Sequence, residues 1–148
     1  MSTLNIAELR TLDPKIVALG SSKGIIQSIL DFDFLAGRAK PSVVAVVATG
    51  RKSERYFFGE GEVTIPVYAA VGQLPKSRRD QVNLFLNLSS GRRVLASSKQ
   101  AMEQLPALVG GVVFAEGLPE RHAIQLAEAA KAAGVWLTGG ASVGVVVP

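Results

Sequence analysis

The sequence predicts an α/β domain with Rossmann-like, three-layer architecture and a mostly parallel sheet. Short, nearly continuous apolar runs recur along the chain, which is typical of strands buried on both faces. Helical stretches lie between several of these runs, and strand–helix–strand repeats imply parallel pairing with right-handed crossovers. The chain has 148 residues, of which 48% are hydrophobic and 19% are charged. It is therefore long enough for one domain with a sizeable core.

Seven strands are expected from these apolar runs. They cover residues 15–19, 42–48, 55–58, 62–68, 82–88, 111–115 and 135–138. The strands at 55–58 and 62–68 are the weakest of the set. Because proline cannot donate a hydrogen bond to a sheet, Pro66 predicts that its strand is short or lies at an edge.

Three helices are expected between the strands, at residues 25–35, 97–105 and 119–133. Pro106 ends the second of them. The third has the clearest pattern, with Pro119 at its start and Gly134 directly after its end. Residues 1–14 are expected to form an N-terminal arm or short helix, and residues 15–148 the Rossmann-like domain.

The first predicted strand runs directly into the loop Gly20-Ser21-Ser22-Lys23-Gly24 and then into a helix. Unpaired N–H groups and the helix dipole favour anions at a helix N-terminus. Glycine at both ends of the loop allows a close approach of the backbone to a ligand, and Lys23 adds positive charge. The loop therefore predicts a site for a phosphate-bearing ligand, although neither G-x-G-x-x-G nor a P-loop is present. The alternative is an ordinary turn with a solvated Lys23.

The loop after the second strand carries Gly50, Arg51 and Lys52. Dinucleotide folds that select an unphosphorylated ribose place Asp or Glu at this point. Two basic residues instead predict a phosphorylated ribose, as in coenzyme A (CoA) or NADP. The alternative is that both side chains only extend into solvent.

Ligands of parallel sheets bind beyond the carboxyl ends of the strands, so two further loops are expected beside the first two. The third loop offers Ser90 and Arg92, and arginine can hold a phosphate through two parallel hydrogen bonds. Arg93 is a weaker candidate. Glu116 is the carboxylate best placed in the fourth loop, or else it caps the next helix. The basic cluster at residues 76–80 is expected to be a solvated turn.

Several functional classes are disfavoured by composition. The chain has no cysteine, which excludes disulfides, cysteine-ligated zinc and a cysteine nucleophile. His122 is the only histidine and is expected to be a solvated helix residue, so we expect no metal site and no catalytic constellation. The net charge of +4 suits an anionic ligand but does not by itself indicate nucleic acid. Without a signal peptide or a long apolar run, the sequence predicts a cytoplasmic protein with no membrane partner.

An ordered set of motifs resembles the ATP-citrate lyase family. The pieces are I-L-D-F-D-F at 29–34, K-P-S-V-V-A at 40–45, F-F-G at 57–59, I-P-V-Y at 65–68, N-L-S-S-G-R-R at 87–93 and A-E-G-L-P-E at 115–120. They are similar to the family's L-D-F-D-[YF], P-S-V-A, F-Y-W-G, I-P-V-F, N-F-A-S-L-R-S and A-E-G-I-P-E. Succinyl-CoA ligase α subunits share the E-G-[IL]-P pattern but not the D-F-D run. The resemblance is therefore nearer to the citrate branch, which includes citryl-CoA synthetase.

The resemblance implies a Rossmann-like CoA-binding domain. Its CoA-holding positions correspond here to residues 20–24, to Gly50 through Lys52, and to Ser90 with Arg92. In the family's reaction, a phosphohistidine passes phosphate to citrate, and CoA displaces it from citryl phosphate to give citryl-CoA. The lyase form then releases acetyl-CoA and oxaloacetate. The phosphohistidine lies in a following domain and is not matched by His122, so this chain is expected to hold CoA for a larger ATP-dependent enzyme.

Other interpretations remain open at this stage. The chain could be an NADP-binding oxidoreductase domain, with only Glu116 or His122 for proton transfer, or the CoA-binding part of a succinyl-CoA ligase-like enzyme. It could also be an interaction protein that packs Trp136 and its neighbours on other domains or subunits. Two positions depart from the family: Gly139-Gly140 replaces its G-P, and the chain ends at Pro148, where the family continues into its ligase domain. We therefore expect an excised domain or a stand-alone relative.

Overall fold

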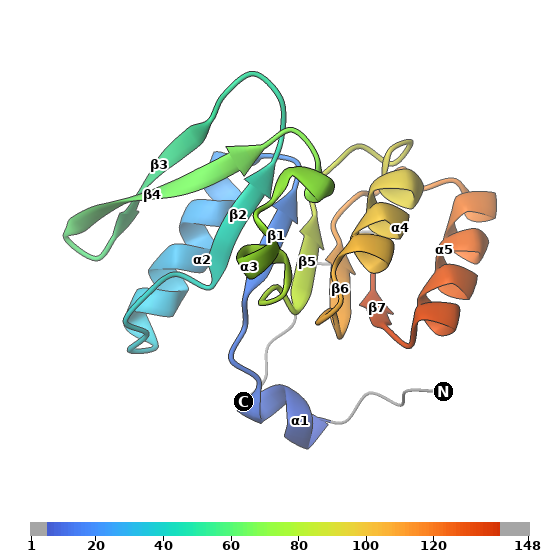
Figure 1. The fold of residues 1–148 in the computed structure, drawn as a ribbon, viewed down its shortest axis with the longest axis horizontal. Coiled ribbons are helices and arrows are strands. Elements are labelled where there is room, and N and C mark those ends of the chain that lie inside the picture. Colours follow the sequence, from blue (N-terminus) through green and yellow to red (C-terminus); the bar gives the residue numbers. More distant parts are fainter. Residues whose placement is uncertain (1–5, 140–148) are drawn as a thin grey trace.

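A seven-stranded sheet forms the centre of the computed structural model, which describes residues 6–139 (Figure 1). The strands are β1 (Ile16–Leu19), β2 (Val43–Val47), β3 (Ser53–Phe58), β4 (Gly61–Tyr68), β5 (Leu84–Asn87), β6 (Gly110–Val113) and β7 (Trp136–Thr138). They lie in the order β3-β4-β2-β1-β5-β6-β7. Each neighbouring pair is parallel except the antiparallel hairpin of β3 and β4. The predicted mostly parallel sheet is confirmed.

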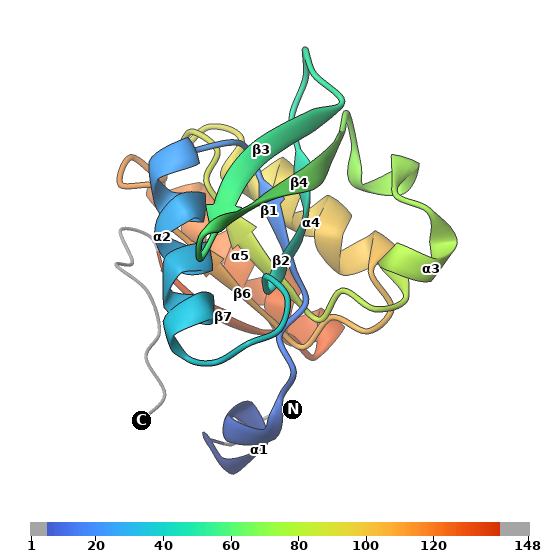
Figure 2. The same ribbon diagram turned by 90° about the vertical axis from the view of Figure 1, so that its left-hand side faces the viewer.

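Helices cover both faces of this sheet, which gives the predicted three layers (Figure 1 and Figure 2). One face is covered by α2 (Lys23–Leu35), and the other by α4 (Val94–Gln104) and α5 (Glu120–Ala133), which pack side by side. The shorter segments are α1 (Ile6–Thr11), the 3₁₀ turn η1 (Val71–Gln73) and α3 (Lys76–Arg79). Helix α1 lies within residues 1–14, for which an arm or short helix was expected.

The central strand β1 contributes to the core on both faces of the sheet. Its Val17 and Leu19 side chains belong to the cluster that contains Leu126 of α5. Between them, Ala18 points to the other face and belongs to the cluster with Ile26 of α2. Full burial of each larger side chain contributes about 1.5–3 kcal/mol. This two-sided burial explains why the strand is an unbroken apolar run in the sequence.

The prediction for the strand containing Pro66 was wrong. With eight residues, β4 is neither short nor at the edge, because it lies between β3 and β2. Residues 61–66 pair with β3, whereas β2 is paired only through Val67 and Tyr68. The chain passes from pairing with β3 to pairing with β2 directly after Pro66, so the residue without an N–H group lies where the pairing changes.

The basic cluster at residues 76–80 is also more ordered than predicted. Four of these residues form α3, and Arg78 is half-buried. Its Nη1 donates a hydrogen bond to the carbonyl oxygen of Val44 in β2, at 2.6 Å. The prediction of a solvated turn is thus wrong for Arg78, because its long side chain reaches back to the sheet.

Two helices begin earlier than predicted. The structure starts α2 at Lys23, two residues before the expected position, and α4 at Val94, three residues before it. For α2 the shift matters most, because Lys23 and Gly24 now lie in the first turn of the helix. Their N–H groups become part of the helix N-terminus.

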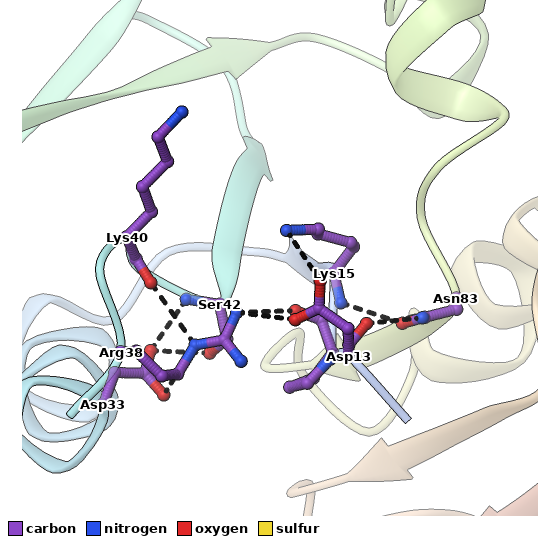
Figure 3. A network of polar contacts seen from close by, with 8 residues as sticks. Asp13, Lys15, Asp33, Arg38, Lys40, Ser42 and Asn83 are labelled. Atoms are coloured by element: carbon purple, nitrogen blue, oxygen red, sulfur yellow. Dashed lines mark hydrogen bonds and ion pairs between the residues drawn. The ribbon is translucent and has the colours of Figure 1, made fainter. Parts of the chain in front are cut away.

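A polar network lies where β1, β2 and β5 begin, and Figure 3 shows it from close by. Asp33, near the end of α2, is buried and accepts two hydrogen bonds from Ser42, one from the backbone N–H and one from the hydroxyl, both at 2.7 Å. Arg38 forms ion pairs with Asp33 at 3.9 Å and with Asp13 at 3.1 Å. These contacts fasten the end of α2 to the start of β2.

The same network ties the segment before β1 to the sheet. The side chain of Asp13 forms an ion pair with Lys15 at 3.3 Å, and the backbone N–H of Lys15 donates to Asn83 Oδ1 at 2.8 Å. Hydrogen bonding to Lys15, and then to Arg38, holds the pKa of Asp13 below its usual range. This end of the strands is therefore closed by structural contacts.

Two of the family-like motifs also meet in space. The rings of Phe34 and Phe58 lie edge to face with centroids 5.5 Å apart and an interplanar angle of 83°. Gly59 follows directly, and a Cβ atom there would overlap the ring of Phe34. Glycine is required at this point both for space and for its φ of +65°. The end of α2 and the β3–β4 hairpin are thus packed against each other.

Candidate ligand-binding site

The structure brings the four predicted loops to one edge of the sheet. Parallel register places Leu19 of β1 beside Val47 of β2 and Asn87 of β5, and Asn87 beside Val113 of β6. These strands therefore end at the same level, and their loops leave in the same direction. The edge lies opposite the polar network of Figure 3. We call the loops at residues 20–24, 49–53, 89–93 and 116–119 the first to fourth loops.

The first loop touches the third loop at Gly20. The N–H of Gly20 donates to the carbonyl oxygen of Val47 at 2.8 Å, and its φ is +96°. A Cβ atom at this position would lie 3.2 Å from backbone atoms of Leu88 and Ser89. Glycine therefore allows both the sharp turn and the close approach of the two loops.

A Gly20→Ala substitution is expected to lower the free energy of unfolding by about 1–2 kcal/mol, because it combines a left-handed φ with a tight contact. Urea unfolding monitored by circular dichroism would measure the loss. The matched control is Gly24→Ala, because a Cβ at Gly24 meets nothing within 4 Å. That variant is expected to be stabilised by up to about 1 kcal/mol through higher helix propensity. Equal effects of the two substitutions would contradict this account of Gly20.

The N-terminus of α2 presents free donors at the first loop. The first intrahelical hydrogen bond runs from Ile26 N–H to Ser22 O at 3.0 Å. The N–H groups of Lys23, Gly24 and Ile25 precede it and have no acceptor within the helix. The side chain of Ser22 makes no capping hydrogen bond, so it does not compete for them. This arrangement suits an anionic oxygen.

The second loop is basic and exposed. Gly50 has a φ of +90°, and the side chains of Arg51 and Lys52 are exposed. Arg51 Nη1 lies 4.0 Å from Glu54 Oε2, whereas Lys52 forms no ion pair within residues 6–139. Its ammonium group is therefore available to a ligand.

The third loop is hydrogen-bonded to the buried side-chain amide of Asn87, a residue that was not predicted from the sequence. Asn87 is fully buried, and its Nδ2 donates to Ser97 Oγ at 2.8 Å and to Ser98 Oγ at 2.9 Å. Its Oδ1 accepts hydrogen bonds from the backbone N–H of Ser89 at 3.1 Å and from the Ser89 hydroxyl. The only signal in the sequence is a polar residue at the end of an apolar strand.

Beyond Asn87, the third loop contacts the fourth. A Cβ at Gly91 would overlap the carbonyl oxygen of Gly117. Ser90 and Arg92 are both exposed, and the Arg92 guanidinium has no hydrogen bond or ion pair in the part of the chain that is described. Glu116 is exposed too, and α5 starts at Glu120 without a side-chain cap, so Glu116 is not a helix cap.

A buried carboxylate beneath the first and second loops was also missed. Glu54 in β3 accepts hydrogen bonds from the hydroxyls of Ser21 and Tyr56. Burial, and then the hydrogen bond to Glu54, raise the pKa of Tyr56 far above its usual range. The alternation of β3 places Glu54 and Tyr56 on the same face, which is the signal that would have indicated a buried pair.

Other kinds of site find no support in residues 6–139. They contain no group of three or more His, Asp or Glu side chains arranged to hold a metal ion. No helix among them has both the length and the apolar character needed to cross a bilayer. His122 is half-buried rather than solvated, because its position in α5 faces the body of the domain. A cavity of about 410 Å³ lies between α5 and β6–β7, and none of its lining residues comes from the first three loops.

Comparison with known proteins relates the chain to one group of enzymes. No family model matches it. ATP-citrate synthase beta chain protein 1 of Arabidopsis thaliana is 38% identical over 120 residues, which are 80% of this chain and 19% of the relative. The chain spans about a fifth of the length of such curated relatives.

Solved structures lead to the same group. ATP citrate lyase from Methanothrix soehngenii, in complex with citrate and coenzyme A, superposes with a TM-score of 0.83 at 26% identity. A mutant ATP citrate lyase from Methanosaeta concilii, in complex with (3S)-citryl-CoA, gives a TM-score of 0.82 at 26% identity. Each match covers 89% of this chain and 21% of the enzyme. The resemblance inferred from the motifs is confirmed: the chain is a homologue of one segment of the ATP-citrate lyase family.

Proposed function

We propose that this chain is the CoA-binding domain of an ATP-dependent citrate–CoA ligase or lyase. The observation that supports this most strongly is its similarity, over 89% of its length, to an ATP citrate lyase whose structure contains citrate and coenzyme A. The free cations and helix N-terminal amides at the edge of the sheet give this proposal a chemical basis. The D-F-D run favours the citrate branch over succinyl-CoA ligases.

Three of the four loops contact the phosphate groups of CoA in this proposal. Phosphate oxygens of CoA bind at the N-terminus of α2, while Lys52 and Arg51 face the 3′-phosphate and Arg92 forks onto the pyrophosphate. The full set of residues proposed to form the site, by contact with CoA or by shaping its loops, is Gly20, Ser21, Ser22, Lys23, Gly24, Gly50, Arg51, Lys52, Ser90, Arg92 and Glu116. In this proposal, residues 15–148 are the domain and residues 1–14 are its arm. Residues 1–5 and 140–148, which include Gly140 and Pro148, lie outside the described residues.

The chemistry of the whole enzyme belongs to other domains or subunits, which are the partners of this one. The thiol sulfur of CoA attacks the carbonyl carbon of citryl phosphate: a C–S bond forms, the C–O bond to phosphate breaks, inorganic phosphate leaves and the thiol proton is released, so that citryl-CoA results. The proposed task of this chain is to bind and orient CoA for that attack, with no catalytic residue and no metal of its own. Its location in the cytoplasm stays a prediction from the sequence.

Calorimetric titration with CoA, 3′-dephospho-CoA and NADP tests the proposal. CoA is expected to bind, and loss of the 3′-phosphate is expected to weaken binding by about tenfold or more, because its charge-assisted contacts with Lys52 and Arg51 are lost. Equal affinity for CoA and 3′-dephospho-CoA would contradict the role of the second loop. Binding of NADP without CoA would favour an oxidoreductase domain, and no binding of CoA would contradict the proposal.

A further inference from the structure

The Glu54 side chain is 0% exposed, although it carries a carboxylate and lies outside the four loops. Burying such a charge is costly unless hydrogen bonds or opposite charges compensate it. Its compensating groups come from Tyr56 on the same strand, from Ser21 in the first loop and from Arg51 in the second. The two loops at the candidate site are therefore connected through one buried group.

The hydrogen bonds between Ser21 and Glu54 have a defined direction. Ser21 Oγ lies 2.8 Å from Glu54 Oε1 and 3.0 Å from Oε2. Ser21 is the donor in both hydrogen bonds, so its hydroxyl proton points inward. Towards the edge of the sheet, the oxygen of Ser21 then offers lone pairs and no proton. Phosphate contacts in the first loop thus fall to backbone amides and to Ser22, while Ser21 serves as the anchor.

We propose that Glu54 is the positioning residue of the first loop and acts through Ser21. By holding that hydroxyl, it fixes the path of the chain into α2 and hence the direction of the free amides. Arg51 partly neutralises the same carboxylate and draws the second loop towards it. The consequence for the ligand rests on the proposed CoA site, whereas the ordering of the loop does not.

Backbone ¹⁵N relaxation of the ligand-free protein tests the ordering. Order parameters of the Ser22 and Lys23 amides are expected to fall from about 0.85, typical of rigid backbone, to below about 0.7 in Ser21→Ala and Glu54→Gln. Tyr56→Phe is the matched control, because it removes the other hydroxyl that donates to the same carboxylate and keeps the hydrogen bonds from Ser21 to Glu54. Unchanged order in Ser21→Ala, or an equal loss of order in Tyr56→Phe, would overturn the proposal. Ser21 is exposed, so its variant keeps the test decisive if Glu54→Gln does not fold.

Titration of the same variants with CoA tests the consequence for binding. Ser21→Ala and Glu54→Gln are each expected to weaken CoA binding roughly three- to tenfold, and the double variant no more than either alone, because they break one contact. Tyr56→Phe is expected to stay within about twofold of the wild type. Multiplying effects in the double variant would contradict action through Ser21. If the wild type fails to bind CoA while the relaxation result holds, the proposed function fails and the positioning role stands.

Discussion

Arg92→Ala is expected to weaken CoA binding by about 10- to 150-fold without loss of the fold. The substitution removes a charge-assisted contact, which contributes about 1.5–3 kcal/mol. The Arg92 side chain is exposed and has no hydrogen bond or ion pair within residues 6–139, so its removal leaves no protein group without a partner. Calorimetric titration gives the affinity, and thermal unfolding of the same sample shows whether the fold is kept.

The neighbouring Arg93 provides the matched control. It is also exposed and stands at the start of α4, but it is outside the proposed binding set. Arg93→Ala is expected to change CoA affinity by less than about threefold. Arg92→Lys should recover only part of the loss, since lysine cannot form two parallel hydrogen bonds. Unchanged affinity in a folded Arg92→Ala protein would refute the assignment.

Asp33→Ala is expected to lower the free energy of unfolding by about 3 kcal/mol. The substitution leaves the N–H and hydroxyl of buried Ser42 without their acceptor, and each such group costs about 1–3 kcal/mol. Urea unfolding at neutral pH would measure the change. CoA affinity of the folded fraction is expected to stay the same, because Asp33 lies at the opposite end of the strands from the four loops.

Asp31→Ala is the control for this prediction. Asp31 lies two residues earlier on α2, is exposed, and accepts a hydrogen bond only from Gln27 among the described residues, at 2.9 Å. Its loss is expected to cost less than about 0.5 kcal/mol. Comparable destabilisation by the two substitutions would mean that the buried contact with Ser42 is not what Asp33 contributes.

The elements of the fold could be predicted because each leaves a local signal. The strand containing Val17 is an apolar run, and the helix that ends before Gly134 carries its own start and stop residues. The environment of Pro66 could not be predicted in this way, since it depends on which strands the chain pairs with on each side. The reach of Arg78 to Val44 depends likewise on tertiary packing over 34 residues of sequence.

In the candidate site, too, the features with a local signal could be predicted, and those that depend on tertiary contacts could not. Glycines and basic residues after strands indicated the loops, because turn geometry and charge are local properties. Glu54 and its contact with Ser21 were not foreseen, since the two residues are 33 positions apart and neither is unusual in its own segment. Asn87 was missed because its role depends on α4, which folds back over the end of β5.

Three of the six family-like motifs supply contacts that stabilise the fold. The motif at 29–34 is joined to the motif at 40–45 through Asp33 and Ser42, and to the motif at 57–59 through Phe34 and Gly59. These contacts stabilise the fold whatever ligand the loops hold. A relative can keep these three motifs and still hold a different ligand, so ligand assignments across this group should be read from positions such as Lys52 and Arg92.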